Sequence, residues 1–330
     1  MSNTTSDDVI DLTDGANYSD KEVDIYAITM AKGGIGKSTT TRLLGQIYAS
    51  RGERILLFDV DPQGSLVTTF DVQAKYDADQ AWADYGGGIT DAILNSQPEA
   101  IARDHVIISD NLHLVQGGNV LDKLNMALAS IDVAESQERL VDALSHLHDQ
   151  YGYDRILIDM PAGGYSNLSK LALNICDWGI MPCGPDHADA EGIRTCLRRA
   201  KEWGSQIEWI ITFLTKYHPG SPKEQANAHQ RIRQWLVSDG QDNQHLFAPY
   251  NSIRHCPGIL NKAIAAKMPL HDYVEAINSD NPPEHIAGDG PLEKSAMPLV
   301  QELDDLADEI DARVTIKKRH RDRSATGTAS

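Results

Sequence analysis

The chain has 330 residues, of which 41% are apolar and 24% are charged, and its formal net charge is −18. It has no run of about 18 apolar residues that would predict a membrane-spanning helix, and no basic-then-apolar start typical of a secretory signal. The four cysteines show no CxxC spacing, so neither a disulfide framework nor a zinc site is expected. These features predict a cytoplasmic protein.

Charge is distributed unevenly along the chain. Residues 1–24 hold seven acids and one lysine, whereas residues 313–330 hold six Lys or Arg and one Asp. Both segments are poor in large apolar groups, so we expect an acidic disordered segment over 1–23 and a basic disordered tail over 313–330. The region between them, 24–312, is expected to form one folded domain. Its acidic excess argues against a broad nucleic-acid-binding face.

From Asp24 onward, short apolar runs alternate with stretches of helical spacing. Runs such as "DIYAITMA" and "RILLFDV" are bounded by charges or glycine, as in strands buried on both faces. Strands that alternate with helices predict an α/β domain with a mostly parallel, doubly wound sheet. The expected strands are 24–31, 54–60, 105–109, 112–116, 155–160, 178–183, 208–214 and 245–250, and long helices are expected near 121–149, 187–204 and 222–238.

The end of the domain has two further features. Residues 277–293 are rich in Pro, Gly and Asp and predict a loop insertion. The helix after it carries one apolar stripe, which predicts packing on the sheet, with a membrane- or partner-binding helix as the alternative. The stripe consists of Leu299, Leu303, Leu306 and Ile310.

The segment "AITMAKGGIGKSTTTRLL", residues 27–44, has the strand–loop–helix order of a phosphate-binding loop. Its glycines let the backbone wrap around phosphate oxygens, and the helix N-terminus attracts the anion. Lys37 is expected to reach the β- and γ-phosphates, and the Ser38 hydroxyl to complete a Mg²⁺ shell. Ala31 departs from the strict GxxxxGK[ST] pattern. The expected nucleotide-binding residues are Gly33, Gly34, Ile35, Gly36, Lys37, Ser38 and Thr39.

A second lysine, Lys32, precedes the glycines. At the mouth of the loop, its side chain is badly placed to fold back on its own phosphates. A cation supplied in trans, by contrast, stabilises the charge on a transferring phosphoryl group. Considered alone, the position is equally consistent with an exposed, solvated lysine.

Three aspartates follow apolar strands. Asp59 and Asp61 in "LLFDVDPQGS" lie at the carboxyl end of a strand, where α/β sheets place ligands. Asp61 is placed to orient a water toward the γ-phosphate and Asp59 to hold the Mg²⁺ water shell, although both also suit a turn before Pro62. Asp159 in "RILIDMPAGG" ends another strand and would supply a carboxylate to the Mg²⁺ environment.

The motif "KGGIGKSTT" resembles the deviant Walker A motif of the ParA/MinD class of ATPases, and "DVDPQGS" and "DMPAGG" are similar to further segments of that family. The similarity covers nearly all of residues 24–312. It implies ATP and Mg²⁺ as cofactors, and a homodimer in which Lys32 contacts the nucleotide of the other subunit. It also implies that Asp61 activates the attacking water. The expected catalytic residues are Lys32, Lys37 and Asp61, with Ser38, Asp59 and Asp159 around the metal.

The same resemblance implies a slow ATPase for partition of a plasmid or chromosome, without an N-terminal DNA-binding domain. ATP would close the dimer, the dimer would bind nonspecific DNA on the nucleoid, and a ParB-like adaptor protein would stimulate hydrolysis. The segment after Ala312 lacks the apolar face of an amphipathic anchor, so no membrane contact is expected.

Many short ParA proteins carry arginines in two turns that contribute to DNA binding. Here those turns read "TFLTKYH", which includes Tyr217, and "APYNS", in which Tyr250 replaces the second arginine. The remaining candidates for DNA contact are Arg194, Arg198, Lys216, Arg254, Lys317, Lys318 and Arg319.

Other functions stay open at this point. A positioning ATPase for a protein cargo, or an adaptor that binds ATP and barely hydrolyses it, would keep the same motifs. A metabolic P-loop enzyme of related fold would leave "DVDPQGS" unexplained. An iron–sulfur reductase would need cysteines such as Cys176 and Cys183 to meet at a dimer axis.

Overall fold

The computed structural model describes residues 23–70, 85–163, 166–216, 222–238, 241–248, 252–279, 281–287 and 296–327. The acidic segment predicted to be disordered lies outside these residues except for Val23. Tyr217 and Tyr250 also lie outside them.

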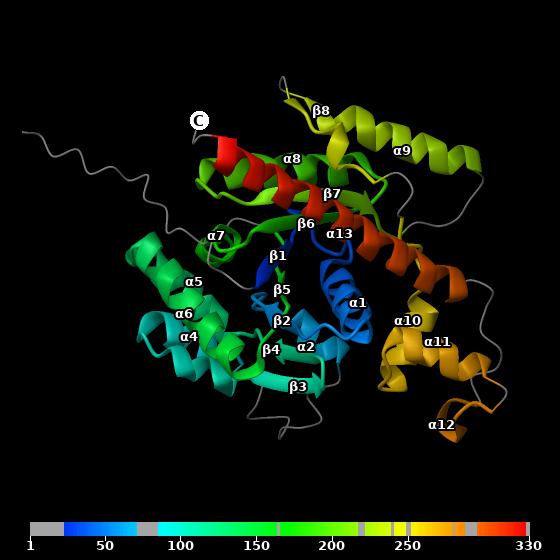
Figure 1. Cartoon of the computed structure of the whole chain (residues 1–330), viewed down its shortest axis with the longest axis horizontal. Coiled ribbons are helices and arrows are strands. Elements are labelled where there is room, and N and C mark those ends of the chain that lie inside the picture. Colours follow the sequence, from blue (N-terminus) through cyan, green and yellow to red (C-terminus); the bar gives the residue numbers. More distant parts are fainter. Residues whose placement is uncertain are drawn as a thin grey trace, which may run out of the picture.

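A seven-stranded sheet forms the centre of the protein, in the order β3-β4-β2-β5-β1-β6-β7 (Figure 1). Neighbouring strands are parallel except for the antiparallel pair β3 and β4. This arrangement confirms the predicted α/β architecture. The strands are β1 (Asp24–Ile28), β2 (Ile55–Asp59), β3 (His105–Ser109), β4 (Leu112–Val115), β5 (Arg155–Asp159), β6 (Trp178–Cys183) and β7 (Glu208–Leu214).

Helices connect the strands and continue after the last of them. They are α1 (Lys37–Ser50), α2 (Ser65–Thr69), α4 (Gly87–Leu94), α5 (Val120–Ala127), α6 (Val133–Tyr151), α7 (Asn167–Asn174), α8 (His187–Glu202), α9 (Pro222–Leu236), α10 (Pro257–Ala265), α11 (Leu270–Asn278), α12 (Glu284–Ala287) and α13 (Ala296–Gly327). None of these described helices is both long enough and apolar enough to cross a membrane.

The sheet is covered on both faces, because side chains alternate along each buried strand. In β1, Tyr26 and Ile28 join one core cluster, whereas Ile25 and Ala27 join another. The first cluster contains α1, α10, α11 and α13, and the second contains α4 to α7 (Figure 1). Helices α8 and α9 build a third cluster over β6 and β7.

Helix α1 lies very close to the sheet. A Cβ on Gly45 would stand 2.6 Å from the Cδ2 atom of Leu57 in β2, so any larger residue would force the helix or Leu57 to shift. The helix ends at Ser50, and Gly52 follows with φ +88°, which is the left-handed conformation expected of a glycine C-cap. Because α1 packs closely on the sheet and follows the loop after β1, its first turn lies near the carboxyl ends of β1 and β5.

The prediction of a disordered basic tail was wrong for residues 313–327, which continue α13. The predicted apolar stripe of α13 is buried on the sheet and extends to Val314. Beyond it, Lys317 pairs with Glu208 at 2.8 Å and Lys318 pairs with Asp24 at 2.6 Å. Apolar packing and ion pairs to acids at the strand starts therefore order a segment whose composition predicts disorder.

Two further predictions need correction. Residues 245–248 form no extended strand, because Phe247 makes only an isolated bridge to Thr212 and follows a short 3₁₀ turn, Gln244–Leu246. A two-residue pair, β8 (Val237–Ser238) and β9 (Gln241–Asp242), precedes that turn. The expected loop at 277–293 includes the end of α11 and the helix α12, and 288–293 lie outside the described residues.

Candidate nucleotide-binding site

The phosphate-binding loop joins the carboxyl end of β1 to the first turn of α1. Gly34 and Gly36 have φ of +73° and +96°, which side chains rarely adopt, and no described atom lies within 4 Å of a Cβ built on either. Gly33 lies against Ala162 in the loop after β5, and a Cβ there would stand 3.5 Å away. The space beside Gly34 and Gly36 is therefore open, which is compatible with a bound phosphate.

Lys37 is the first residue of α1 and is only 6% exposed. Its Nζ atom donates to the carbonyl oxygen of Lys32 at 3.5 Å, so the side chain folds over the loop. Burial lowers the pKa of Lys37, while the nearby carboxylates of Asp159 and Asp61 act in the opposite direction. A buried ammonium held over an open loop of this kind fits a phosphate ligand.

Asp59 and Asp61 both follow β2 but have different surroundings. Asp59 is fully buried, and its carboxylate accepts hydrogen bonds from the backbone N–H groups of Asp61 at 2.9 Å and Leu66 at 3.0 Å. Burial and the adjacent Asp159 raise the pKa of Asp59 well above its usual range. Asp61 accepts from the backbone N–H of Gln63 at 2.9 Å. The hydrogen bonds of Asp59 thus stabilise the turn that contains Asp61. They favour the interpretation of Asp59 as a turn residue.

Asp159 is the last residue of β5 and stands opposite Asp59 in the sheet register. Its Oδ1 atom accepts from the Thr41 hydroxyl at 3.3 Å, and the Ser38 hydroxyl also hydrogen-bonds to the carboxylate. The Oδ2 atom is buried without a partner in the described part of the chain. Burial raises the pKa of Asp159 to about 7, although Ser38 and Lys37 oppose that shift. An orphaned carboxylate oxygen beside a serine hydroxyl fits the oxygen ligands that Mg²⁺ prefers.

Lys32 is held by its own chain. Its Nζ atom lies 2.8 Å from Oδ1 of Asp189, and its side chain is 41% exposed whereas that of Asp189 is 2% exposed. The hydrogen bond to Asp189 raises the pKa of Lys32. Asp189 lies in the first turn of α8 and forms a capping box with Asp186. The carboxylate therefore belongs to a rigid helix start and sets the direction of the lysine.

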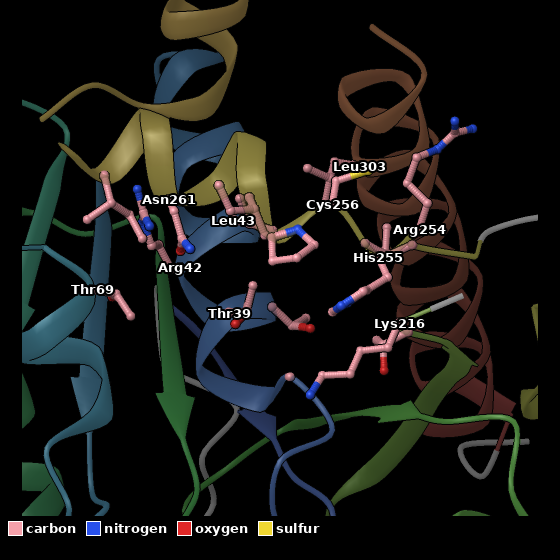
Figure 2. Close-up of a pocket in the computed structure, with 17 residues that line it drawn as sticks. Thr39, Arg42, Leu43, Thr69, Lys216, Arg254, His255, Cys256, Asn261 and Leu303 are labelled. Atoms are coloured by element: carbon pink, nitrogen blue, oxygen red, sulfur yellow. The ribbon is translucent and has the colours of Figure 1, made fainter. Parts of the chain in front are cut away.

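A cavity of about 330 Å³ extends from the phosphate-binding loop along α1 (Figure 2). Figure 2 shows Lys216 and His255 on one side of the view, Arg42 and Asn261 on the other, and Thr39 between them. Its volume is in the range of small-molecule sites. The cavity places a ligand next to the side of α1 that follows Lys37.

Four cations predicted to contact DNA lie on the phosphate-loop side or on α8. Lys216 donates to the carbonyl oxygen of Gly34, and Arg254 pairs with Glu302 at 2.6 Å, so both belong to the walls of the cavity. Arg194 and Arg198 lie on α8 and pair with acids one turn away on the same helix. These four residues do not form one open basic face.

The other three lie on α13, at the opposite edge of the sheet. Lys317 and Lys318 pair with Glu208 and Asp24, the first residues of β7 and β1. Arg319 is exposed and follows them on the helix. The structure therefore separates the candidate DNA-contacting residues into groups at the two edges of the sheet.

Sequence patterns did not indicate two residues that the structure brings to the site. Asp189 reaches Lys32 from α8, and no local motif signals that contact. Arg42 lies on the cavity wall in a stretch of α1 that is otherwise threonine and leucine. A lone arginine on the buried side of a helix is the only available signal for that position.

A protein-family model described as an AAA domain matches residues 23–212, more than half of the chain. The sporulation initiation inhibitor protein Soj of Bacillus subtilis is 29% identical over 180 residues, which span 54% of this chain and 64% of that protein. The chromosome partitioning protein ParA of Caulobacter vibrioides is 27% identical over 174 residues, spanning 53% of this chain and 61% of that protein. The matches thus span less than two thirds of the length of these two relatives.

Solved structures share the fold. An ATP complex of McdA from Cyanothece superposes with a TM-score of 0.62 at 15% identity, covering 88% of this chain and 97% of that one. A plasmid partition protein from Borrelia burgdorferi gives a TM-score of 0.54 at 19% identity, covering 75% of this chain and 95% of that one. At these identities the likeness concerns the fold alone.

The fold and the loop after β1 define a P-loop ATP-binding protein, and the family match includes that loop and all three aspartates. Together with the Soj and ParA relatives, this match confirms the resemblance noted from the motifs. The chain belongs to the ParA/MinD family of ATPases.

Proposed function

We propose that this protein is a ParA-type partition ATPase that dimerises around ATP, binds nonspecific DNA in that state, and is released when a partner protein stimulates hydrolysis. The proposal depends above all on the convergence of Lys37, Asp61 and Asp159 at one edge of the sheet. The kinship with Soj and ParA supports it.

The site residues suggest how the nucleotide is held. Its phosphates would lie in the loop of Gly33 to Gly36 with Lys37 above them, and its base would enter the cavity beyond Thr39. Ser38 and Asp159 would hold a Mg²⁺ ion, which neutralises charge on the β- and γ-phosphates when bound. Asp61 would orient the attacking water, as its place after β2 allows.

Lys32 would act on the nucleotide of the second subunit. To reach that nucleotide, the Lys32 side chain has to leave Asp189. The buried carboxylate of Asp189 would then lose its only cation in the described structure. Dimerisation would therefore exchange one charge contact for another. Such an exchange of contacts suits a reversible switch.

A positioning ATPase that carries a protein cargo is the second candidate. It is favoured by the ion pairs at the candidate DNA-contacting residues, because Arg254, Lys317 and Lys318 are each already paired with an acid. Cations neutralised in this way release fewer counterions on DNA and so contribute less to affinity.

An iron–sulfur reductase is disfavoured. Cys176 and Cys183 are both buried in the subunit, at 6% and 0% exposure. Cys176 precedes β6 and Cys183 ends it. The six residues between them are mostly extended chain, so the two cysteines lie roughly 20 Å apart. Neither is available at a subunit surface.

The first test is binding of the full chain to a random DNA duplex with ATP, with ADP and without nucleotide, across a salt series. We expect tight binding with ATP alone that weakens steeply with salt. Lys37→Ala is the control, because loss of nucleotide binding should abolish the ATP-dependent binding to DNA. Arg319→Gln, which removes an exposed cation, should flatten the salt dependence if α13 contacts DNA.

The outcome separates the two candidates. An ATP-dependent dimer that binds no DNA would contradict the partition proposal and support a protein cargo. Absence of both dimer and DNA binding would contradict both.

A further inference from the structure

Arg42 is a cation buried in α1, one helical turn beyond Thr39. It is only 4% exposed, and its guanidinium lies over the ring of Phe70 at 5.3 Å from the ring centroid. Within the described chain, the side chain has no ion pair, and its Nε atom has no hydrogen-bond partner. Burial lowers the pKa of Arg42 to about 10, so the group remains charged at neutral pH.

Two other poorly exposed arginines have partners within the described chain. Arg199, which is 2% exposed, donates to the carbonyl oxygen of Gly163 at 2.8 Å. Arg155 pairs with Glu53 and with Asp311, and the side chain of Arg155 is 16% exposed. Burying a charge without such a partner is costly, since the charge loses its hydration and gains nothing in return. Within the described chain, Arg42 has neither an acidic partner nor a carbonyl acceptor, so its charge lacks a compensating partner there.

Arg42 forms part of the wall of the cavity beside α1 (Figure 2). None of the described residues that line this cavity is acidic. Figure 2 shows Thr69 and Asn261 on the same side of the view as Arg42, and the apolar residues Leu260 and Ile264, which flank Asn261 on α10, also line the cavity. The surface thus combines one unpaired guanidinium, a few neutral polar groups and an apolar wall.

We propose that this end of the cavity binds a small organic anion, with its carboxylate or phosphate group on Arg42 and its apolar body against Leu260 and Ile264. A guanidinium offers two parallel N–H donors that match either anion. The volume of about 330 Å³ accommodates a small molecule of this kind and no folded partner.

The proposed site is continuous with the nucleotide site, because Gly36 and Thr39 line the same cavity. An anion on Arg42 would lie beside the expected position of the nucleotide base. Each ligand would then change the affinity of the other by the same factor, since coupling between two sites is reciprocal. The anion site itself requires neither dimerisation nor ATP hydrolysis, so it can be tested separately from the proposed function.

The test is calorimetric titration of the full chain saturated with ADP and Mg²⁺, which fills the phosphate-binding loop. The probes are phenyl phosphate, benzoate and the uncharged benzyl alcohol, at matched ionic strength. We expect at least one anion to bind tenfold or more tightly than benzyl alcohol, and the preferred anion distinguishes phosphate from carboxylate. Arg42→Met should weaken that binding at least tenfold, and Arg42→Lys should restore part of it.

Thermal unfolding without added anion gives an independent readout. Arg42→Met should melt at the same temperature as the wild type or higher, because it removes an uncompensated buried charge. The matched control is Arg155→Met, which should melt lower, because it leaves Glu53 and Asp311 without their cation, and should keep the anion affinity. If neither anion binds, or if Arg42→Met binds them as tightly as the wild type, the proposal is wrong.

Discussion

Glu208 and Asp24, at the amino ends of the strands (the amino edge of the sheet), have different partners from Asp159, at the carboxyl ends (the carboxyl edge). At the amino edge, Glu208 is paired with Lys317 and Arg321, and Asp24 is paired with Lys318. At the carboxyl edge, Asp159 is buried with one carboxylate oxygen unpartnered among the described residues, and the pKa of Asp159 is raised to about 7 by burial. Partial burial also acts to raise the pKa of Glu208, but hydrogen bonds from Lys317 and Arg321 outweigh it and lower that pKa.

This difference indicates that the charges at the amino edge contribute to stability, whereas those at the carboxyl edge contribute to ligand binding. Ion pairs at the amino edge anchor α13 and serve the folded state, as charges satisfied within the chain do. The carboxyl edge keeps charges that the described chain leaves incompletely paired, and such charges are costly unless a ligand completes them. The unpaired groups therefore indicate where ligands bind. The predictions below test this contrast.

The largest effect is expected from Asp61→Ala. If Asp61 orients the attacking water, its loss should slow ATP hydrolysis by roughly 100-fold, the usual contribution of such a group. Nucleotide binding should persist, and the dimer should accumulate with ATP. Phosphate release and light scattering measure the two effects. Unchanged turnover would remove Asp61 from the reaction.

Asp159→Asn should raise the Mg²⁺ concentration needed for half-maximal hydrolysis about tenfold, because a neutral amide holds the cation and its water less well. A Mg²⁺ titration of ATPase activity measures this. Asp104 is the matched control, since it is also a buried acid whose pKa is raised to about 7 by burial, but its carboxylate accepts from the backbone N–H of Ile89 in α4. If Asp104→Asn shifted the titration equally, burial alone would be responsible.

Variants of Lys32 and Asp189 test whether Lys32 has to leave Asp189 before the dimer forms. Lys32→Ala should keep ATP binding and lose the ATP-dependent dimer. Asp189→Asn keeps the shape of the side chain but removes its charge, so dimerisation should need roughly fivefold less ATP, at the low end of typical coupling energies. Sedimentation across an ATP series measures both variants. A dimer that forms normally with Lys32→Ala would contradict a role in trans.

The smallest effect is expected at the amino edge. Glu208→Gln should destabilise the protein by about 0.5 kcal/mol near neutral pH, as is usual for partly exposed ion pairs. Because folding lowers the pKa of Glu208, its contribution is present above the unfolded value of 4.5 and is lost as the pH falls through and below that value. Urea unfolding of the wild type and the variant at several pH values measures the difference. Glu138→Gln, at an exposed site on α6, is the control, and an equal effect there would contradict a specific role for the α13 contact.

Local sequence was sufficient to predict most of the fold and the phosphate-binding loop. Strands buried on both faces appear as continuous apolar runs, and the loop is one contiguous segment whose glycines and Lys37 act through their own backbone and side chain. The strand prediction failed at 245–248, where one bridge to Thr212 replaces a ladder. There the apolar residues are used for packing.

Only the tertiary structure decided which charges are paired. Composition predicted disorder for the segment of α13 that holds Lys317, whereas Glu208 and the apolar stripe order it. Lys32 has its partner on α8, and Arg42 has none in the described chain, although both lie in the same short stretch of sequence. The free energy of a charge depends on its burial and on neighbours that are distant along the chain. That environment exists only after folding. The sequence alone therefore determined the chemistry of the loop, whereas the structure determined which charges lack a partner within the described chain.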